Sequence, residues 1–477
     1  MVLSLLAGIF LLLLLTMIAR TMVLQQSKEA APQTRRTVDE QDALGILSKA
    51  VQCKTISHQD PERTDWNEFI RLADLFAQTY PRCESHRITP EAGANNLVYR
   101  FEGEDTQAAP ALLTAHLDVV GAQEEAWLHP PFSGVIEDGY LYGRGSFDCK
   151  VQAVAILTAF ESLLAQHKRP KRTFYVAFGC DEECNGSQEG ACSIASWFEK
   201  QGISFAYVLD EGGVVSQRYI KGFDQDIAVV GVAEKGYMDV ELSAASSAGH
   251  SSTPSFPTAL GLVCQAVQSL ERRTMPARLT VPVRAMLDSL GRQAKFPFRL
   301  LFLNLWITKP MLLGIFSRSP TLNALIRTTV VPTMIEASDK SNVIAEQAKA
   351  MVNVRLLPGQ TPDDVLAWME KVIRNPKVKL KAVRFTPASE VSPAKGEAFD
   401  HLEKTITACF DHVLVTPYLM LGATDARKYQ KLSKHIYRFT PVRMDRSEVE
   451  RMHGVDERIS EQNIRLAATF YATLIQG

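Results

Sequence analysis

Metal-ligand side chains recur just after apolar, strand-like runs in this sequence. The side chains in this position are His116, Asp118, Glu182, Glu183 and Asp210. Asp148 lies between the first two runs in GRGSFDCK, and His453 lies near the C-terminus in RMHGVDE. Two imidazoles and several carboxylates are the ligands that a pair of hydrolytic zinc ions needs. One carboxylate can be shared between ions about 3.5–4 Å apart, and another can take protons from water. The sequence therefore predicts a two-metal hydrolase.

Each of these residues also fits an ordinary structural role when it is taken alone. Asp148 could be the N-cap of the helix that the apolar spacing predicts over 151–166. The other candidates could be solvated strand ends, turn residues or loop histidines. The prediction of a metal site therefore depends on the combination of residues and not on any one of them.

The pattern of elements indicates how these residues could meet. From about 41 to 232, strand-like runs alternate with helical patterns, which predicts a parallel sheet built from βαβ units. An open α/β sheet places its site at the carboxyl ends of neighbouring strands. Near 235 the pattern changes to half-exposed strands such as KGYMDVELSA, and a helix opens at a Thr361–Asp364 capping pair. Because ligand-type residues resume at Asp425, we expect the intervening α+β segment to be an inserted domain.

The N-terminus is apolar enough to interact with a membrane. Residues 1–19 carry no charged side chain, and their length is close to the minimum for a transmembrane helix. No basic residue precedes this stretch and no clear A-x-A site follows it, which favours an uncleaved single-pass anchor over a cleaved signal peptide of a secreted protein. Basic residues follow the stretch, and the positive-inside rule would keep that flank in the cytoplasm. The side of the membrane stays open.

Composition excludes some classes of partner. The 477 residues have a net charge of −1, which argues against a nucleic-acid surface. The eight cysteines show no disulfide-type spacing, and we expect Cys180 and Cys184 to be small core residues and not a zinc pair. The apolar stretch 296–316 is interrupted too often by charge and proline to span a bilayer. It could form core helices or a wall for an apolar substrate.

Eight segments in order resemble the zinc-dependent aminoacylase and carboxypeptidase S family of co-catalytic exopeptidases. The segments are HLDVV, GRGSFDCK, DEE, DEGG, AGHSS, NVRLLPG, GATDAR and HGVDE. The resemblance runs from about residue 40 to the C-terminus and is nearest the branch of carboxypeptidase S and the N-fatty-acyl-amino-acid synthase/hydrolases. It implies an α/β fold of the zinc exopeptidase type, with a mixed, mostly parallel sheet flanked by helices. An inserted α+β, ferredoxin-like lid or dimerisation domain and an N-terminal hydrophobic helix would complete the chain.

The expected division of the chain has five parts. They are an anchor or signal segment at 1–24, a polar stalk at 25–40, a first part of the catalytic domain at 41–232, a lid or dimerisation domain at 233–387, and a second catalytic part at 388–477.

The resemblance also implies a role for each matching metal ligand. Asp148 would bridge two zinc ions per chain, with His116 and Asp210 completing one site. Glu183 and His453 would complete the other site.

Further residues match the catalytic and substrate-binding positions of the family. Glu182 would be the general base, and Asp118 would orient the histidine two residues before it. His250 would stabilise the oxyanion, often across a dimer interface, and Arg355 would bind the free carboxylate of the substrate. Weaker candidates for the substrate pocket, for which a structural role is equally open, are Asn342, Thr424 and Arg427.

The function implied is hydrolysis of the amide bond of dipeptide-like or N-acyl amino acid substrates that carry a free α-carboxylate. One alternative is an aminoacylase restricted to short acyl groups. Another is a non-catalytic, membrane-tethered binding protein, which would have lost a ligand or the base, whereas the sequence keeps them all. The acyl preference, hydrolysis versus synthesis, the metal used in the cell (zinc, cobalt or manganese) and a homodimer through the inserted domain stay open.

Overall fold

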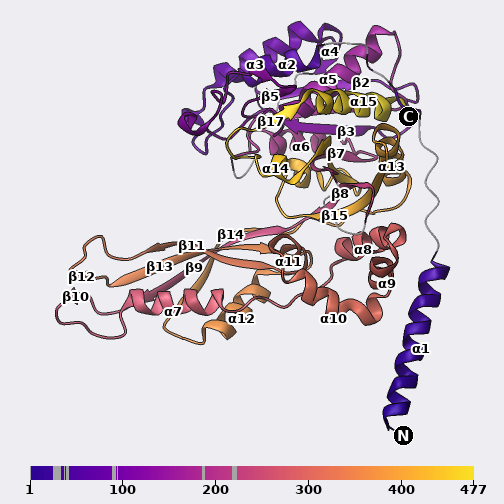
Figure 1. Ribbon diagram of the computed structural model, residues 1–477. Coiled ribbons are helices and arrows are strands. Elements are labelled where there is room, and N and C mark those ends of the chain that lie inside the picture. Colours follow the sequence, from indigo (N-terminus) through magenta and orange to yellow (C-terminus); the bar gives the residue numbers. More distant parts are fainter. Residues whose placement is uncertain are drawn as a thin grey trace.

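The two largest β-sheets of the computed structural model lie one above the other in Figure 1, and an N-terminal helix extends below them. It describes residues 2–24, 34–36, 38, 42–88, 93, 95–184, 188–217 and 223–477. Most of the stalk expected at 25–40 therefore lies outside the described residues. The expected domain boundaries stay a prediction.

The larger sheet, here the main sheet, has eight strands in the order β1-β2-β6-β3-β7-β16-β8-β15. Strand β3 is parallel to β6 and β7, β7 is parallel to β16, and β8 is parallel to β15, whereas β1, β2 and β6 pair antiparallel. Strand β8 is also antiparallel to β16 and to β7, so the expected mixed sheet is confirmed. The strand bounds are β1 (Arg87–Ile88), β2 (Leu97–Phe101), β3 (Ala111–His116), β6 (Phe174–Gly179), β7 (Val208–Ser216), β8 (Asp226–Glu234), β15 (Val413–Met420) and β16 (Ile436–Met444).

Helices cover both faces of the main sheet, which explains why its strands are almost continuously apolar. Successive strand residues point to opposite faces. Leu113 and Val176 accordingly pack into the core that contains α5, while their neighbours Leu112 and Tyr175 pack into the core that contains α6. The helices of this part are α2 (Ala43–Val51), α3 (Trp66–Thr79), α4 (Pro81–Glu84), α5 (Lys150–Ala165), α6 (Ala191–Lys200), α13 (Glu397–Cys409), α14 (Arg446–Val449) and α15 (Glu461–Gln476), with short 3-10 turns η1 (Pro61–Arg63), η2 (Glu124–Ala126) and η3 (Asp425–Tyr429).

A small three-stranded sheet joins the C-terminal loop to the segment before α5. Its order is β17-β5-β4, and Arg458 of β17 lies opposite Tyr142 of β5. This pairing brings the loop that carries His453 to the loop that carries Asp148. The strands are β4 (Ile136–Glu137), β5 (Tyr140–Tyr142) and β17 (Arg458–Ser460).

The second sheet is antiparallel, with four strands in the order β11-β13-β9-β14. Buried and half-buried residues alternate along β9 and β13, because one face of the sheet packs against α7 and α12. The predicted Thr361–Asp364 capping box opens α12. The elements are β9 (Gly236–Ala245), β11 (Thr329–Glu336), β13 (Gln347–Leu356), β14 (Lys379–Thr386), α7 (Ala259–Glu271) and α12 (Pro362–Ile373), and a short pair, β10 (Gly249–His250) with β12 (Val343–Ile344), forms the far tip seen in Figure 1.

A group of helices lies between the second sheet and the N-terminal helix. Its members are α8 (Val281–Gln293), α9 (Phe296–Leu303), α10 (Leu305–Phe316) and α11 (Pro320–Ile326). The stretch 296–316 forms α9 and α10, which meet at an angle of 109°. Both helices contribute to a core cluster with α8, as expected for core helices, although one face of α10 stays exposed. Among the described residues, one helix is long and apolar enough by itself to cross a membrane, over Ser4–Val23 of α1 (Val2–Val23).

Candidate metal centre

Three neighbouring strands of the main sheet deliver most of the candidate ligands to one edge. His116 ends β3 and lies opposite Gly179, the last residue of β6, in the parallel register. The loop after β6 carries Glu182 and Glu183, and β7 lies on the other side of β3. Asp148 comes from the loop before α5, whose N-cap is Cys149 and not Asp148. The carboxylate of Asp148 is therefore available for another role.

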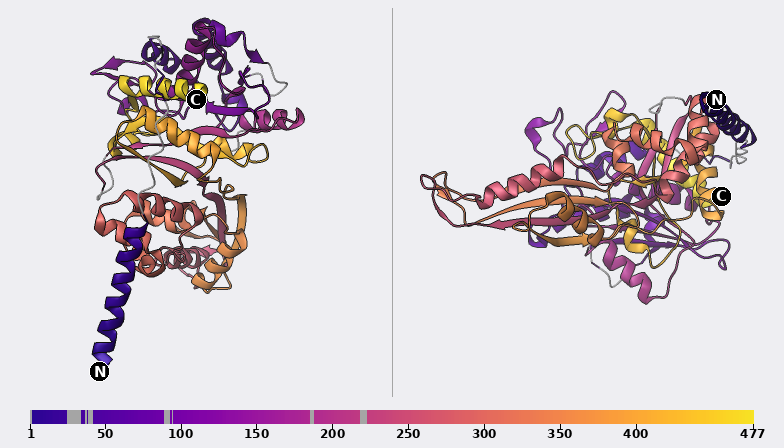
Figure 2. Two further views of the ribbon diagram at one scale, coloured as in Figure 1. Left: turned by 90° about the vertical axis from the view of Figure 1, so that its right-hand side faces the viewer. Right: turned by 90° about the horizontal axis from the view of Figure 1, so that it is seen from below.

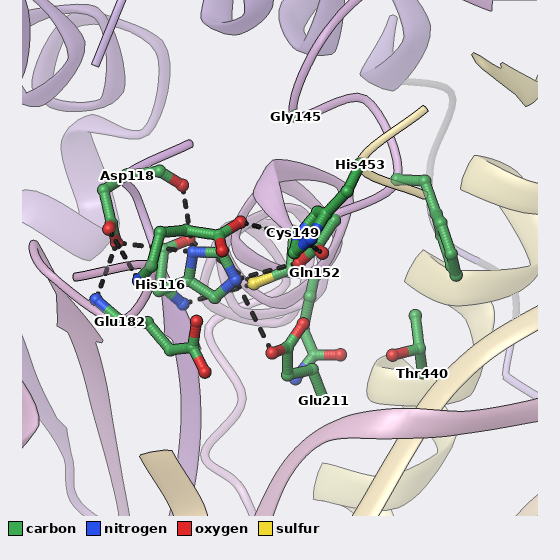
Figure 3. Close-up of polar contacts among 12 residues, drawn as sticks. His116, Asp118, Gly145, Cys149, Gln152, Glu182, Glu211, Thr440 and His453 are labelled. Atoms are coloured by element: carbon green, nitrogen blue, oxygen red, sulfur yellow. Dashed lines mark hydrogen bonds and ion pairs between the residues drawn. The ribbon is translucent and has the colours of Figure 1, made fainter. Parts of the chain in front are cut away.

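The two oxygens of the buried Asp148 carboxylate face two different histidines. Oδ1 lies 2.9 Å from Nε2 of His116, and Oδ2 lies 2.9 Å from Nε2 of His453. Beyond these histidines, Oε1 of Glu211 is 3.5 Å from Nε2 of His116, and Oε1 of Glu183 is 3.0 Å from Nε2 of His453. Figure 3 shows His116, Glu211 and His453 converging, with Glu182 beside them. Asp148 thus joins two histidine–carboxylate groups.

The structure differs from the sequence prediction at one ligand. Glu211, not Asp210, belongs to the group of potential metal-binding atoms that contains His116 and Asp148. The buried Asp210 carboxylate instead accepts a hydrogen bond of 2.6 Å from the backbone N–H of Ala426. Because adjacent residues of a strand point to opposite faces, only one carboxylate of the Asp-Glu pair on β7 can face the cluster.

Asp118 holds both the first histidine and the loop of the glutamates. Its backbone carbonyl lies 2.9 Å from Nδ1 of His116, and a carboxylate oxygen lies 3.4 Å from the same nitrogen. The carboxylate also accepts hydrogen bonds from the backbone N–H groups of Glu182 and Glu183, at 3.1 and 3.0 Å, and from the hydroxyl of Ser57. A carboxylate behind a metal-binding imidazole fixes its tautomer and ring orientation, which is the role predicted for Asp118.

Glu457 supports the cluster and was not identified from the sequence. Its buried carboxylate pairs with Arg144 at 2.6 Å and accepts hydrogen bonds from the backbone N–H groups of Gly145, Phe147 and Asp148 at 2.9–3.1 Å. This carboxylate therefore shapes the loop that presents Asp148. The only signal in the sequence is its place in the HGVDE segment, four residues after His453.

The electrostatics of the cluster favour the addition of positive charge. Burial raises the pKa of the Glu211 carboxyl to about 8, and the charge of Asp148 adds to this effect. Burial, together with nearby carboxylates, also raises the pKa of Glu182 well above its usual value. Hydrogen bonds to Asp148 and Glu183 raise the pKa of His453 to about 10. The carboxylate and imidazole donors of the cluster fit a pair of divalent ions.

Cys149 also lies within reach of the first group but has a separate set of contacts. Its sulfur accepts a hydrogen bond from the backbone N–H of His116 at 3.2 Å and donates to the carbonyl of the same residue at 3.4 Å. Burial and the charge of Glu211 raise the pKa of the thiol well above its usual value. The two hydrogen bonds hold the Cys149 side chain against the end of β3.

The cluster opens into a cavity of about 590 Å³ that is lined by both sheets. Glu182, Glu211 and His453 line it from the main-sheet side, and Arg355 and Tyr237 line it from the second sheet. The guanidinium of Arg355 lies 4.8 Å from the centre of the Tyr237 ring. Arg355, which the sequence suggests as the ligand of the substrate carboxylate, therefore lies on the cavity wall. The stretch 296–316 contributes none of the described lining residues.

Thr424 and Arg427, two weaker candidates for the substrate pocket, line the same cavity but also have a structural partner. The Thr424 hydroxyl lies 2.9 Å from the buried carboxylate of Glu234, and Nε of Arg427 lies 2.7 Å from it. Arg438 pairs with the same carboxylate. The contacts with Glu234 therefore fix both side chains at the wall of the cavity.

His250 and Asn342 lie together at the far tip of the second sheet. The backbone N–H of Ser251 donates to the carbonyl of Asn342 at 3.1 Å, and Nδ1 of His250 is 2.7 Å from the hydroxyl of Ser252. Both candidates are exposed, and neither is among the described residues that line the cavity. One chain therefore does not bring these two residues to its own metal cluster.

Comparisons with known proteins agree with this arrangement. Residues 112–477 match Peptidase family M20/M25/M40. The chain is 35% identical over 483 residues to a probable carboxypeptidase S-like 2 of Dictyostelium discoideum, covering 99% of this chain and 93% of that protein. It is 37% identical over 439 residues to an N-fatty-acyl-amino acid synthase/hydrolase of Xenopus tropicalis, covering 90% and 85%. The fold is similar to that of an M20 family metallo-carboxypeptidase, Sso-CP2, of Sulfolobus solfataricus, with a TM-score of 0.66 and 15% identity over 91% of this chain and 99% of that one.

Proposed function

The chain belongs to peptidase family M20/M25/M40 and is a hydrolase, and we propose that it cleaves the amide bond of N-acyl amino acids or dipeptide-like molecules with a free α-carboxylate. One observation carries this proposal above the others. The Asp148 carboxylate lies between two histidine–carboxylate groups, with Glu182 adjacent to them, at the end of a cavity that an arginine lines from the opposite sheet.

We propose two zinc ions as the cofactor. His116, Asp148 and Glu211 would hold one ion, and Asp148, Glu183 and His453 would hold the other. When bound, the pair would polarise the substrate carbonyl and lower the pKa of water. Asp118 and Glu457 would keep the ligands oriented through the contacts described above.

Glu182 would move the proton during the reaction. It would accept a proton from the attacking water and deliver it to the leaving nitrogen. Burial raises the pKa of its carboxyl, which makes it a stronger proton acceptor than an exposed glutamate.

Arg355 would bind the free α-carboxylate of the substrate. Its guanidinium can form two parallel hydrogen bonds with a carboxylate, and its stacking on Tyr237 limits its movement. A substrate held in this way spans the cavity from the second sheet to the metal cluster.

His250 would act from a second copy of the chain. Its exposed position at the tip formed by β10 and β12 is accessible to a partner, and a two-fold dimer through the second sheet would exchange the two tips. The second sheet and its helices would then serve as the lid and dimerisation domain. Asn342, which lies beside His250, would enter the partner's cavity with it.

We further propose that α1 is retained as a membrane anchor. The buried hydroxyl of Thr21 near the end of α1 accepts a hydrogen bond of 2.9 Å from the amide of the buried Asn304. Removal of α1 as a signal peptide would leave this amide without the contact. The mass of the chain purified from its host cells tests this point, since cleavage would remove the residues before about position 25.

The test of the proposed function is a substrate panel with the purified full-length chain and zinc. The panel contains dipeptides, N-acyl amino acids of increasing acyl length, and the same compounds with the carboxylate blocked as an amide. We expect hydrolysis only of the compounds with a free carboxylate. Equal rates on blocked compounds, or no hydrolysis by a chain that contains two metal ions, would refute the proposal.

The same panel separates the alternatives. Rates that rise with acyl length favour the N-fatty-acyl class, which the Xenopus relative's name describes. Rates that fall sharply beyond short acyl groups favour a short-acyl aminoacylase. A non-catalytic binding protein would bind these compounds without turnover.

A further inference from the structure

Helix α10 presents an apolar face to the outside of the molecule. Thr308, Leu312 and Phe316 point inward and are buried against the core formed with α8 and α11. The opposite face consists of Trp306, Ile307, Met311 and Ile315, with exposed fractions of 51%, 37%, 56% and 44%. Residues four apart lie on the same side of a helix, so Ile307, Met311 and Ile315 form one strip, and Trp306 lies next to Ile307 at its N-terminal end. We call this strip the α10 face.

The bend at which α10 begins contacts the C-terminal end of the apolar helix α1. Asn304, at the bend between α9 and α10, donates to Thr21 at 2.9 Å and to the carbonyl of Met17 at 3.4 Å. Arg299 of α9 donates to the carbonyl of Leu24 at 2.8 Å. The views in Figures 1 and 2 agree that the rest of α1 extends away from the body from this point. A bilayer that surrounds α1 must therefore come close to α10.

The charges around the α10 face match a lipid surface. Residues 289–335 contain six basic side chains and no carboxylate. Two of the basic side chains, Lys309 and Arg318, are exposed on α10 and just after it. Long basic side chains at the edge of an apolar strip can reach the headgroups while their stems stay in the apolar layer. A tryptophan such as Trp306 is typical of the same boundary.

We propose that the α10 face is inserted into the boundary between headgroups and acyl chains of the bilayer, beside the span formed by α1. The helix pair α9–α10 does not cross the bilayer, because it bends by 109° at Asn304 and its inner face is packed in the protein core. The molecule is thus held at two adjacent points, and the main sheet lies on the side away from the bilayer (Figure 1). This inference rests on the retention of α1 but not on the chemistry of the metal centre.

Quenching of tryptophan fluorescence by brominated lipids tests the insertion in the full-length chain. All five tryptophans lie in the described part of the chain, and Trp306 is the most exposed of them. The chain is reconstituted into vesicles of phosphatidylcholine and phosphatidylserine, with or without bromine near the headgroup end of the acyl chains. We expect bromine to quench the wild type and Trp306→Phe to remove most of that quenching. Trp197→Phe, on α6 of the main-sheet part, should leave the quenching unchanged.

A second variant covers the case in which Trp306→Phe disturbs the bend through its hydrogen bond to Asn304. Met311→Glu with Ile315→Glu keeps the indole but makes the α10 face polar, and we expect it to reduce the quenching to a similar extent. Metal content and turnover of a water-soluble, short-acyl substrate report on the fold of both variants. Equal quenching of the wild type and Trp306→Phe, or no quenching of the wild type, overturns the insertion. The latter is also the result expected if a second copy or another protein covers this face.

The result of the quenching experiment does not depend on the result of the substrate panel. A chain that fails to hydrolyse any substrate can still show quenching that depends on Trp306, and the membrane inference would then stand alone.

Discussion

Individual side chains decide the chemistry proposed for this protein, and Asp148 is the clearest case. The sequence left two roles open for this residue, an N-cap of the following helix and a shared ligand. The structure gives the N-cap position to Cys149 and directs the two oxygens of Asp148 to two different histidines. A carboxylate in this position can bridge two cations, whereas an N-cap would have used one oxygen on the helix backbone.

Replacement of Glu182 by Gln removes the group that moves the proton but keeps its size. We expect turnover to fall by about 10²–10⁴-fold while the metal content is unchanged. Asp181→Asn is the matched control, since this neighbouring carboxylate accepts hydrogen bonds from the backbone of Glu189 and Gly190 and not from the cluster. Turnover of Glu182→Gln close to that of the wild type would eliminate the role of general base.

The metal-free chain should become less stable as the pH rises. Burial raises the pKa of Glu211 to about 8, so the folded chain binds a proton there that the unfolded chain has released above about pH 4.3. Stability from this proton is present at low pH and is lost as the pH rises through about 8. The melting temperature of the chain treated with a chelator should therefore fall between about pH 5 and about pH 7.5, and by less in Glu211→Gln. An identical fall in both proteins would contradict the assignment.

For the residues of the candidate metal site, the sequence indicated which residue types take part but not which way each side chain points. The sequence suggested His116, Asp148, Glu183 and His453 because each lies in a distinctive segment, and the structure brings these four side chains together. The sequence pointed to Asp210 of DEGG, whereas the structure places Glu211 in the cluster, because side-chain direction depends on which face of β7 meets it. Glu457 was missed because its role depends on burial and on backbone N–H groups far away in the sequence.

Elements bring these side chains together through the register of the main sheet and the small sheet beside it. The alternation of strands and helices predicted the parallel core, because apolar runs of this length favour strands covered on both faces. The strand order could not be predicted. Strand β16 inserts between β7 and β8, and this placement depends on contacts between segments more than 200 residues apart.

Substitution of Glu457 tests how much the loop before α5 contributes to stability and to metal binding. Glu457→Gln leaves Arg144 buried beside a neutral partner, and we expect a loss of about 3 kcal/mol in the free energy of unfolding. Weaker binding of metal by about 10–100-fold should accompany it, because the loop presents Asp148.

Glu450→Gln is the control for this measurement. Glu450 pairs with Arg446 four residues earlier on an exposed helix, so its loss should cost about 0.3–0.5 kcal/mol. Denaturant unfolding of the two variants checks the difference. Equal stabilities would show that the loop does not depend on the buried pair.

The whole molecule combines a catalytic unit, a second sheet with a distant tip, and an apolar helix that extends from the body. The sequence predicted the catalytic unit from its ligand-type segments, and the inserted α+β segment and the N-terminal helix from the pattern of apolar residues. It could not predict that His250 and Asn342 lie at the tip, far from the cavity of their own chain, nor that one face of α10 stays exposed beside α1. Both findings concern surfaces, where the pattern of apolar residues gives little guidance about the partner.

Mixing of two inactive variants tests whether His250 of one copy acts in the active site of a second copy. His250→Ala and Glu182→Gln should each be nearly inactive, but a mixed dimer has one site with an intact base and a histidine from its partner. Random exchange between the two should restore about a quarter of the wild-type turnover. A mixture of His250→Ala with the double variant should stay inactive. Failure of the first mixture to exceed its parents, with mixed dimers present, would contradict the exchange.

The metal content of the purified chain, counted by mass spectrometry in four forms, tests the central claim most directly. We predict two zinc ions per chain in the wild type, nearly none in Asp148→Asn, one in Glu211→Gln, and two in Asp210→Asn. The last two variants differ by one position on β7 and by which face of the strand they alter. A wild type with fewer than two ions, or an Asp148→Asn chain that keeps both, would contradict a shared carboxylate between two metal sites.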